Sequence, residues 1–228
     1  MLYLLDTADA AAIGRLVDYF PVAGVTTNPT LIAREKRALP DILRDIRVAI
    51  GPDLMLHVQV VGPDAATMVD EAERLRDVVG NGFHPKVPMT REGIKTIRLL
   101  ARRGFAVTAT AIITAEQALM AAVAGAAFTA PYVNRLDNIC GDGARVVADI
   151  VTLFRLHGLP TRLLTASFKN VQQVHAVALA GAHSATLPPD IIEQLIRHPL
   201  TDDGVAGFMA DWTAAYGAGT TTADLLKV

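Results

Sequence analysis

Lys86 has the most distinctive chemistry in this sequence, because it lies inside the strand-like segment 83–88, where a solvated lysine is unusual. A free lysine amine titrates at about 10.4, and an apolar wall or neighbouring cations lower that value. An amine that has lost its proton is a nucleophile that attacks a ketone. The alternative is a strand-end lysine that extends its amine to water or pairs with a carboxylate.

Polar side chains also gather at the ends of the other strand-like segments. Thr26 and Asn28 share one parity along the chain, as do Thr108 and Thr110, so each pair can point to the same side of its strand. Their convergence on one rim that also contains an inward lysine predicts a functional site. The residues concerned are Asp6, Thr26, Asn28, Gln59, Lys86, Thr108, Thr110, Tyr132, Asn134, Arg135 and Ser167.

Each of these residues also has a purely structural explanation. Asp6 would cap the helix that follows it, and Ser167 would do the same for a later helix. Thr26 or Thr27 would satisfy loop backbone groups, and Gln59 would hydrogen-bond a turn. Because buried polar groups need partners whatever their function, both explanations stay open for each residue taken singly.

Short segments rich in β-forming residues recur along the chain and are mostly separated by helical patterns. They cover residues 2–6, 22–26, 54–60, 83–87, 106–111, 127–132, 162–167 and 183–187. Repeated strand-helix units predict parallel strands with right-handed crossovers. Eight such strands in 228 residues favour a (β/α)8 TIM barrel over an open doubly wound sheet. In such a barrel the reactive side chains sit at the carboxyl ends of the strands.

The intervening segments carry apolar residues at spacings of three and four and are rich in helix-forming residues. We expect helices over Ala65–Val79, Arg91–Arg103, Ala115–Ala124, Ala144–His157 and Val171–Ala180.

The segment after Pro199 differs from the barrel units and predicts an additional C-terminal helix. A stripe on one face of this helix includes the only tryptophan and needs an apolar surface to pack on. Its members are Val205, Phe208, Met209, Trp212 and Tyr216. We therefore expect a barrel domain over 1–198 and a helical arm over 199–228, which packs on the barrel or on a neighbouring subunit.

The composition is that of a soluble globular protein, with 51% hydrophobic residues and 21 basic residues against 23 acidic ones. The near balance of charge argues against nucleic-acid binding.

The N-terminus reaches Asp6 without a basic segment, which argues against a signal peptide. Glu116 is the only charge between Arg103 and Arg135, but polar residues interrupt that stretch and argue against a membrane span. With Cys140 as the only cysteine, we expect no metal site and a cytoplasmic location.

Five motifs follow one another along the chain. They are Leu4-Leu5-Asp6-Thr7, Gly24-Val25-Thr26-Thr27-Asn28-Pro29, Lys86-Val87-Pro88 with Thr90 and Glu92-Gly93, Ala130-Pro131-Tyr132-Val133-Asn134-Arg135, and Ala166-Ser167-Phe168-Lys169. In these motifs the chain resembles the transaldolase family, and within it the fructose-6-phosphate aldolase branch, over almost its whole length. The lysine motif alone is weak, but the five together in this order are specific.

The resemblance implies a (β/α)8 barrel whose lysine, matched here by Lys86, forms a Schiff base with a ketose and needs no metal or organic cofactor. The protonated imine is an electron sink that lets the C3–C4 bond of the sugar break. The implied reaction is the cleavage and formation of fructose 6-phosphate from dihydroxyacetone and glyceraldehyde 3-phosphate. A transaldolase that moves the same three-carbon unit between phosphosugars is the nearest alternative. A barrel that binds phosphosugars without turning them over is the alternative from another class.

The same resemblance implies roles for the remaining rim residues. Asp6 and Asn28 would hold donor hydroxyls. The acid-base water would be positioned by Tyr132, Gln59 and Thr110. The phosphate would be bound by Arg135 and Ser167, with Lys169 either assisting or solvated. Thr26 is a further substrate-binding candidate because it faces the same rim.

The residues at two positions resemble the aldolase branch more than the transaldolases. Transaldolases proper usually carry Glu where this chain has Gln59 and Phe where it has Tyr132. The residues before the lysine depart from the family, which commonly has β-branched residues where this chain has His84 and Pro85. Since proline cannot donate to a strand ladder, a bulge there would shift Lys86. For His84 an orienting or packing role is favoured over catalysis, because no adjacent residue completes a dyad.

The loop 136–143 also diverges from the family and follows the presumed phosphate-binding strand, which leaves the acceptor preference open. Short members of the family commonly form ring-based homo-oligomers, often decamers, through the C-terminal helix. The apolar stripe of the arm would serve such an assembly.

Overall fold

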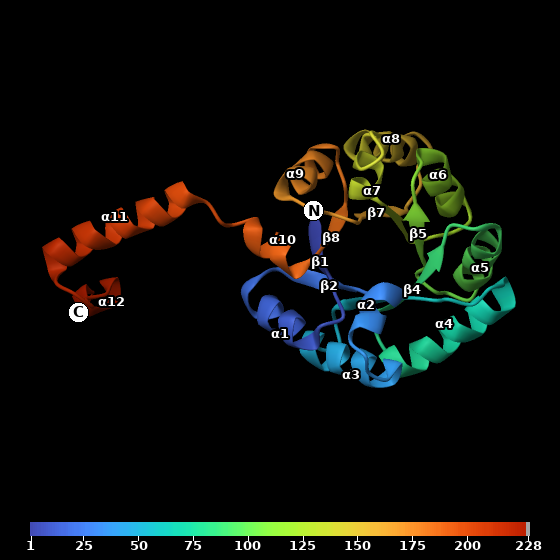
Figure 1. Cartoon of the computed structure of the whole chain (residues 1–228), viewed down its shortest axis with the longest axis horizontal. Coiled ribbons are helices and arrows are strands. Elements are labelled where there is room, and N and C mark those ends of the chain that lie inside the picture. The colour runs from blue at the N-terminus through green and yellow to red at the C-terminus, as the bar shows by residue number, and fades with distance from the viewer. Residues whose placement is uncertain (227–228) are drawn as a thin grey trace. The chain divides into compact units, whose positions relative to one another are not determined.

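The structure is a computed structural model that describes residues 1–226. Eight parallel strands close into a barrel in which each pairs with the next in chain order and β8 pairs with β1. The strands are β1 Leu2–Asp6, β2 Val22–Thr26, β3 Met55–Gln59, β4 Phe83–Pro88, β5 Thr108–Ile112, β6 Phe128–Pro131, β7 Arg162–Thr165 and β8 Ser184–Leu187. Figure 1 shows helices in a ring around these strands, in chain order from blue to orange. The (β/α)8 TIM barrel expected from the sequence is confirmed.

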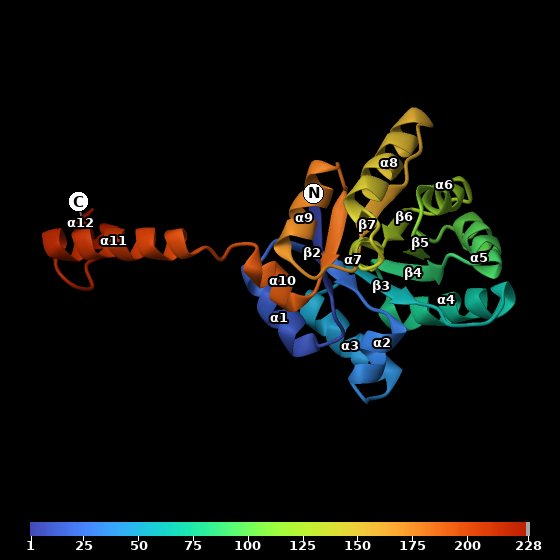
Figure 2. The same ribbon diagram turned by 45° about the horizontal axis from the view of Figure 1, so that its top comes forward.

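The helices of the barrel lie outside the strands, and α4 and α5 flank β4 (Figure 2). The five predicted helices are confirmed to within one residue at each end. The helices of the barrel unit are α1 Ala10–Tyr19, α2 Pro29–Arg34, α3 Leu39–Ile50, α4 Ala65–Val79, α5 Arg91–Arg102, α6 Ala115–Val123, α7 Val133–Asp137, α8 Gly143–Leu156 and α9 Val171–Leu179, with the short α10 Pro189–Gln194 at its end.

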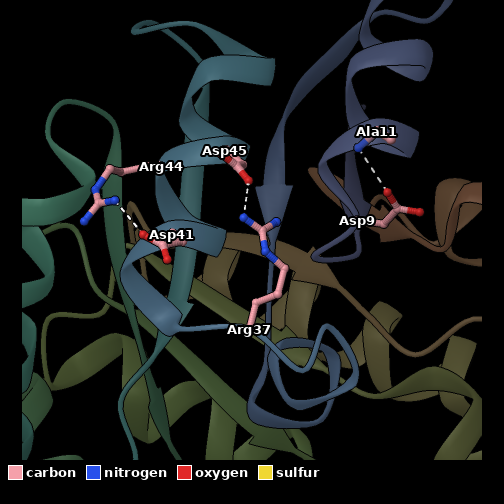
Figure 3. A network of polar contacts seen from close by, with 6 residues as sticks. All are labelled: Asp9, Ala11, Arg37, Asp41, Arg44 and Asp45. Carbon is pink, nitrogen blue, oxygen red and sulfur yellow. Dashed lines mark hydrogen bonds and ion pairs between the residues drawn. The ribbon is translucent and has the colours of Figure 1, made fainter.

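Helix caps decide between the structural and functional explanations of two rim residues. The cap of α1 is Asp9, whose Oδ1 accepts hydrogen bonds of 3.0 Å from the backbone N–H groups of Ala11 and Ala12 (Figure 3). The cap of α9 is Asn170. The capping roles considered for Asp6 and Ser167 are therefore wrong. Neither side chain is used as a helix cap, so both can contribute to the site at the barrel mouth.

One exposed ion pair joins the connection between α2 and α3 to α3, and a second lies within α3 itself. Arg37 Nη2 lies 2.6 Å from Asp45 Oδ2, and Arg44 Nη1 lies 2.6 Å from Asp41 Oδ1 (Figure 3). Such exposed pairs contribute at most about 1 kcal/mol each. Helix α2 is capped by Asn28, whose side chain accepts a 3.0 Å hydrogen bond from the backbone N–H of Leu31.

The core has an inner and an outer layer. Outside the strands, the apolar faces of the helices supply buried side chains such as Ile13, Ile46 and Ile97. Inside the barrel, Leu4 and Phe128 belong to one cluster of buried side chains that also includes Leu164. The barrel interior is thus filled by side chains, as in other barrels of this size.

Gly93 explains one of the sequence motifs. A Cβ atom at this position would collide with the backbone oxygen of Pro88, two residues after Lys86. Only glycine lets the start of α5 approach the end of β4 this closely. Gly93 is therefore part of what fixes the strand that carries the lysine.

The chain divides into two compact units, Met1–Ile192 and Glu193–Val228. The second unit contains α11 Pro199–Tyr216, which is the expected C-terminal helix, and α12 Thr222–Leu225. Within it, Trp212 Nε1 donates a 2.7 Å hydrogen bond to the backbone oxygen of Thr220, and its ring lies 4.5 Å from that of Tyr216. The packing partner of residues 199–228 stays a prediction. Across residues 1–226, no helix has both the length and the apolar character needed to cross a membrane.

Candidate active site

The Lys86 amine lies inside the barrel at the carboxyl ends of the strands. Its side chain is only 5% exposed, and Nζ donates a 2.8 Å hydrogen bond to the backbone oxygen of Thr27. On either side of Lys86 in the register stand Gln59 of β3 and Thr108 of β5. The alternative of a lysine that extends to water is therefore wrong.

Burial and a neighbouring carboxyl group set the protonation of this amine. Burial lowers the pKa of Lys86 from its ordinary value, and the negative charge of Asp6 opposes the change only in part. Burial likewise raises the pKa of Asp6, against the opposing effects of Lys86 and of a hydrogen bond from Thr26. Both groups are shifted towards their neutral forms, so the unprotonated amine that a nucleophile needs is more accessible than in water.

A chain of hydroxyl groups orients Asp6. Thr26 Oγ1 donates a 2.7 Å hydrogen bond to Asp6 Oδ1, and the hydroxyl groups of Thr26 and Thr186 are 2.7 Å apart. Because Thr26 has one hydroxyl hydrogen and gives it to Asp6, the Thr186 hydroxyl donates to Thr26. Three strands, β1, β2 and β8, thus fix the carboxyl group beside the lysine.

A second polar group is built from β5, β6 and α7. Tyr132 Oη and Thr110 Oγ1 are 3.4 Å apart, and the Arg135 guanidinium carbon lies 4.5 Å from the centre of the Tyr132 ring. The cation over the ring face holds both side chains in place. Tyr132 is half-buried and Arg135 is exposed, which leaves the guanidinium free to meet an anion from solvent.

Asn28 and Ser167 both lie at the ends of strands, in different local settings. The Asn28 carbonyl oxygen is used as the cap of α2, so its amide N–H groups are what it can offer to a ligand hydroxyl. Ser167 has a positive φ of 65°, which is uncommon for a residue with a side chain. Strained backbone of this kind persists where the surroundings hold it and is frequent at functional sites.

Pro85 does not displace the lysine. Strands β3 and β4 pair without a register shift, from Leu56 beside Phe83 to Gln59 beside Lys86. The bulge that a proline could introduce is absent between β3 and β4.

His84 packs below the lysine, as the sequence favoured. Its Nδ1 donates a 2.9 Å hydrogen bond to the backbone oxygen of Ala106, and its ring stacks on that of His57 with centroids 4.4 Å apart. His57 in turn is hydrogen-bonded to Thr108. Two histidine rings therefore lie in the interior one layer below Lys86.

Three contributors to the site were missed from the sequence. The contact with the Thr27 backbone oxygen could not be predicted from side-chain patterns. Thr186 lies in a strand, where threonine is an ordinary β-forming residue and suggests no special role. His57 was not singled out, although it shares its parity with Gln59, and that alternation was the one signal available.

An apolar cavity of about 440 Å³ lies next to the lysine site, between β3 and helices α2, α3 and α4. Asn28 and Gln59 border it, but most of its wall is aliphatic, with Leu43, Leu75 and Val78 among the lining residues. A polyhydroxylated ligand would leave its hydroxyl groups unpaired there. The polar mouth around Lys86 is the better site for such a ligand. Among residues 1–226, no group of three or more His, Cys, Asp or Glu side chains is arranged to hold a metal ion.

Fold and site together define a (β/α)8 barrel that carries a buried lysine amine beside a carboxyl group at its mouth. Residues 3–219 match the protein family described as Transaldolase/Fructose-6-phosphate aldolase. The chain belongs to this family, which agrees with the motif resemblance. The family description covers two activities, an aldolase and a transaldolase.

Solved structures of other proteins share the fold at low sequence identity. Dihydrodipicolinate synthase from Rhodopseudomonas palustris has a TM-score of 0.58 at 14% identity, over 95% of this chain and 79% of that one. The 3,6-anhydro-D-galactonate cycloisomerase from Zobellia galactanivorans has a TM-score of 0.58 at 13% identity, over 82% of this chain and 54% of that one. A mandelate racemase/muconate lactonizing protein from Paracoccus denitrificans PD1222 has a TM-score of 0.56 at 15% identity, over 83% of this chain and 55% of that one. The chain thus spans about half the length of the last two, and these likenesses concern the barrel fold alone.

Proposed function

We propose that the protein is a Schiff-base aldolase that cleaves and forms fructose 6-phosphate, with Lys86 as the nucleophile. The observation that carries the proposal is the Lys86 amine itself, which is buried at the barrel mouth and has a pKa lowered by burial. Membership of the transaldolase/fructose-6-phosphate aldolase family supports the same reaction class.

In the proposed reaction the unprotonated Lys86 amine attacks C2 of the ketose, and loss of water gives a protonated imine. Removal of the proton from the C4 hydroxyl breaks the C3–C4 bond, whose electron pair passes into the imine and leaves an enamine. Glyceraldehyde 3-phosphate departs first. Protonation of the enamine at C3 and hydrolysis then release dihydroxyacetone and restore the lysine.

The rim residues take roles that suit their chemistry. Asp6, oriented by Thr26, balances the positive charge of the imine and accepts a donor hydroxyl, and Asn28 donates to a neighbouring hydroxyl. Tyr132 and Thr110 hold the water that moves the C4 proton. Gln59 orients this water but does not titrate.

The phosphate of the three-carbon aldehyde is placed on Arg135 and Ser167. A guanidinium group presents paired donors that match a phosphate, and a hydroxyl group adds a neutral donor. Both residues follow neighbouring strands, and the backbone N–H of Asn134 donates a 2.8 Å hydrogen bond to the backbone oxygen of Ser167. Lys169 is exposed and lies two residues further along the same loop.

Two residues favour the aldolase over the transaldolase. A neutral Gln59 and a titratable Tyr132 fit the aldolase branch that the motifs resemble, and the transaldolase is the second candidate. We extend the proposal to a homo-oligomer, of which a decamer is one form, assembled through the arm 199–228. The reaction requires neither a metal nor an organic cofactor, and a cytoplasmic location suits the single cysteine.

The direct test is chemical trapping of the imine. Incubation with fructose 6-phosphate and borohydride should add a reduced sugar or dihydroxyacetone mass to Lys86, as located by peptide mass spectrometry. An unmodified Lys86 under turnover conditions would instead support a barrel that only binds phosphosugars.

A product assay separates the two reactions. Fructose 6-phosphate alone should release free dihydroxyacetone from an aldolase. Absence of that product, together with efficient transfer to erythrose 4-phosphate, would identify a transaldolase.

A further inference from the structure

The side chain of Gln173 joins the loop after β7 to helix α7. Its Oε1 accepts a 2.8 Å hydrogen bond from the backbone N–H of Lys169. Its Nε2 donates to Asn134 Oδ1 at 3.1 Å and to Asp137 Oδ2 at 2.7 Å. Both N–H groups and the carbonyl oxygen of one amide are therefore used between two segments that lie more than thirty residues apart in the chain.

These two segments carry the proposed phosphate-binding residues. Asn134 directly precedes Arg135, and Lys169 lies two residues after Ser167. The amide of Gln173 does not itself reach the mouth through any of its three bonds. It instead fixes the segment that bears the guanidinium relative to the segment that bears the hydroxyl.

Helix capping does not account for the two hydrogen bonds from Gln173 to α7. Helix α9 is already capped by Asn170, whose Oδ1 accepts from the backbone N–H of Gln173 at 2.9 Å. In the usual capping box the glutamine at this position bonds back to the cap residue, as Gln117 does to the backbone N–H of Thr114 in α6. The bond from Lys169 also has a counterpart in α6, where Gln117 Oε1 accepts from the backbone N–H of Ile113 at 2.8 Å. The two donations from Gln173 Nε2 across to α7 go beyond capping.

The loop that Gln173 holds contains a backbone that needs support. Ser167 has a φ of 65°, a conformation that costs about 1–3 kcal/mol for a residue with a side chain and persists only where neighbours enforce it. Its two flanks are tied down: the backbone oxygen of Ala166 accepts from Val133 N–H at 3.0 Å, and Lys169 N–H donates to Gln173. Loss of the Gln173 bond would free the second flank.

We propose that Gln173 is a positioning residue for acceptor specificity: it sets the spacing of Arg135 and Ser167 at which a phosphate monoester binds to both. The proposal rests on the phosphate role given to these two residues in the proposed function. Because Gln173 acts only on the phosphate end of the acceptor, its loss should leave the chemistry at Lys86 unchanged.

The test compares Gln173→Leu and Gln173→Glu with Gln172→Leu, an exposed neighbour on the same helix that serves as the matched control. Gln173→Leu removes all three hydrogen bonds. Gln173→Glu keeps the acceptor for Lys169 but loses the donors and places a second carboxylate beside Asp137. Both should raise the KM for glyceraldehyde 3-phosphate in the aldol addition about tenfold, with kcat within about twofold of wild type. With unphosphorylated glyceraldehyde both should match the control.

Equal losses with both aldehydes would overturn the proposal, since they would mean that Gln173 supports the whole site rather than phosphate binding. Unchanged KM values in both variants would overturn it as well. Calorimetric titration with inorganic phosphate gives a readout that does not depend on turnover, and both variants should bind it more weakly than Gln172→Leu. Failure of the proposed function is seen separately, in wild-type protein that forms neither product nor a borohydride adduct on Lys86.

Discussion

The imidazole rings of His57 and His84 stack in the barrel interior with centroids 4.4 Å apart and an angle of 13° between their planes. His57 has no exposed surface, and its Nδ1 lies 2.8 Å from Thr108 Oγ1, while its Nε2 has no hydrogen-bond partner within residues 1–226. Burial lowers the pKa of His57 well below its ordinary value, and the charges of His84 and Lys86 act in the same direction. The ring of His57 therefore stays neutral to a lower pH in the folded protein than in the unfolded chain.

This neutral ring predicts a loss of stability in mild acid. In the unfolded chain His57 titrates at about 6.5, so above that pH neither state carries its proton. Below it the unfolded chain binds a proton that the folded protein excludes, and the free energy of unfolding falls by up to about 1.4 kcal/mol per pH unit until the folded pKa is reached. In His57→Phe, which keeps a flat ring, urea unfolding at pH 7.5 and pH 5 should show a smaller loss. His175→Phe, on the exposed side of α9, is the control; equal losses in His57→Phe and wild type would refute the assignment.

Lys86→Met tests the nucleophile. The substitution nearly conserves volume and removes an amine whose burial is costly, so the fold should survive, as circular dichroism would report. Turnover and the borohydride adduct should both vanish. Lys95→Met, on an exposed face of α5, should retain both. Residual aldol cleavage in Lys86→Met above the rate without enzyme would exclude an imine at this residue.

Tyr132→Phe tests proton transfer while it keeps the ring that Arg135 covers. We expect cleavage of fructose 6-phosphate to fall by roughly 10²- to 10⁴-fold, the usual contribution of one acid-base group. Imine formation, measured by borohydride trapping, should persist because it precedes the lost step. A cleavage rate close to that of wild type would remove Tyr132 from the mechanism.

Arg135→Ala tests the phosphate site. Removing a charged donor should raise the KM for glyceraldehyde 3-phosphate roughly 10- to 100-fold, since hydrogen bonds to charged groups are the stronger class. The rate with unphosphorylated glyceraldehyde should change little. Steady-state kinetics with the two aldehydes in parallel gives the comparison, and equal effects on both would contradict a phosphate role.

The barrel could be predicted because local signals repeat along the chain. Several strands have apolar residues on both parities, and each expected helix shows the three-and-four spacing, so the order of elements alone indicates parallel strands around a closed core. The lysine could be singled out for the same local reason, since a charge inside a strand is unusual.

The partners of the site residues could not be predicted in the same way. Thr186 meets Thr26 across 160 positions of sequence, and only closure of the barrel brings them together. The caps were misjudged because Asp6 and Asp9 both have side chains suited to capping, and the choice depends on where β1 ends. In the sequence Gln173 looks like an ordinary surface residue of its helix. Its contacts with α7 depend on the relative positions of the segments that follow β6 and β7, which the sequence does not reveal.

The hydrogen bond from Lys86 to Thr27 bears on stereochemistry. An ammonium group has three hydrogens to share, but a protonated imine has only one, directed in the plane of the C=N bond. An imine that keeps this hydrogen on the Thr27 oxygen has the plane of its C=N bond fixed. With the donor hydroxyls held on Asp6 and Asn28 as well, one face of the enamine is turned towards the incoming aldehyde. A carbonyl oxygen that no side-chain substitution removes would then help to decide which configuration the new carbon centre receives.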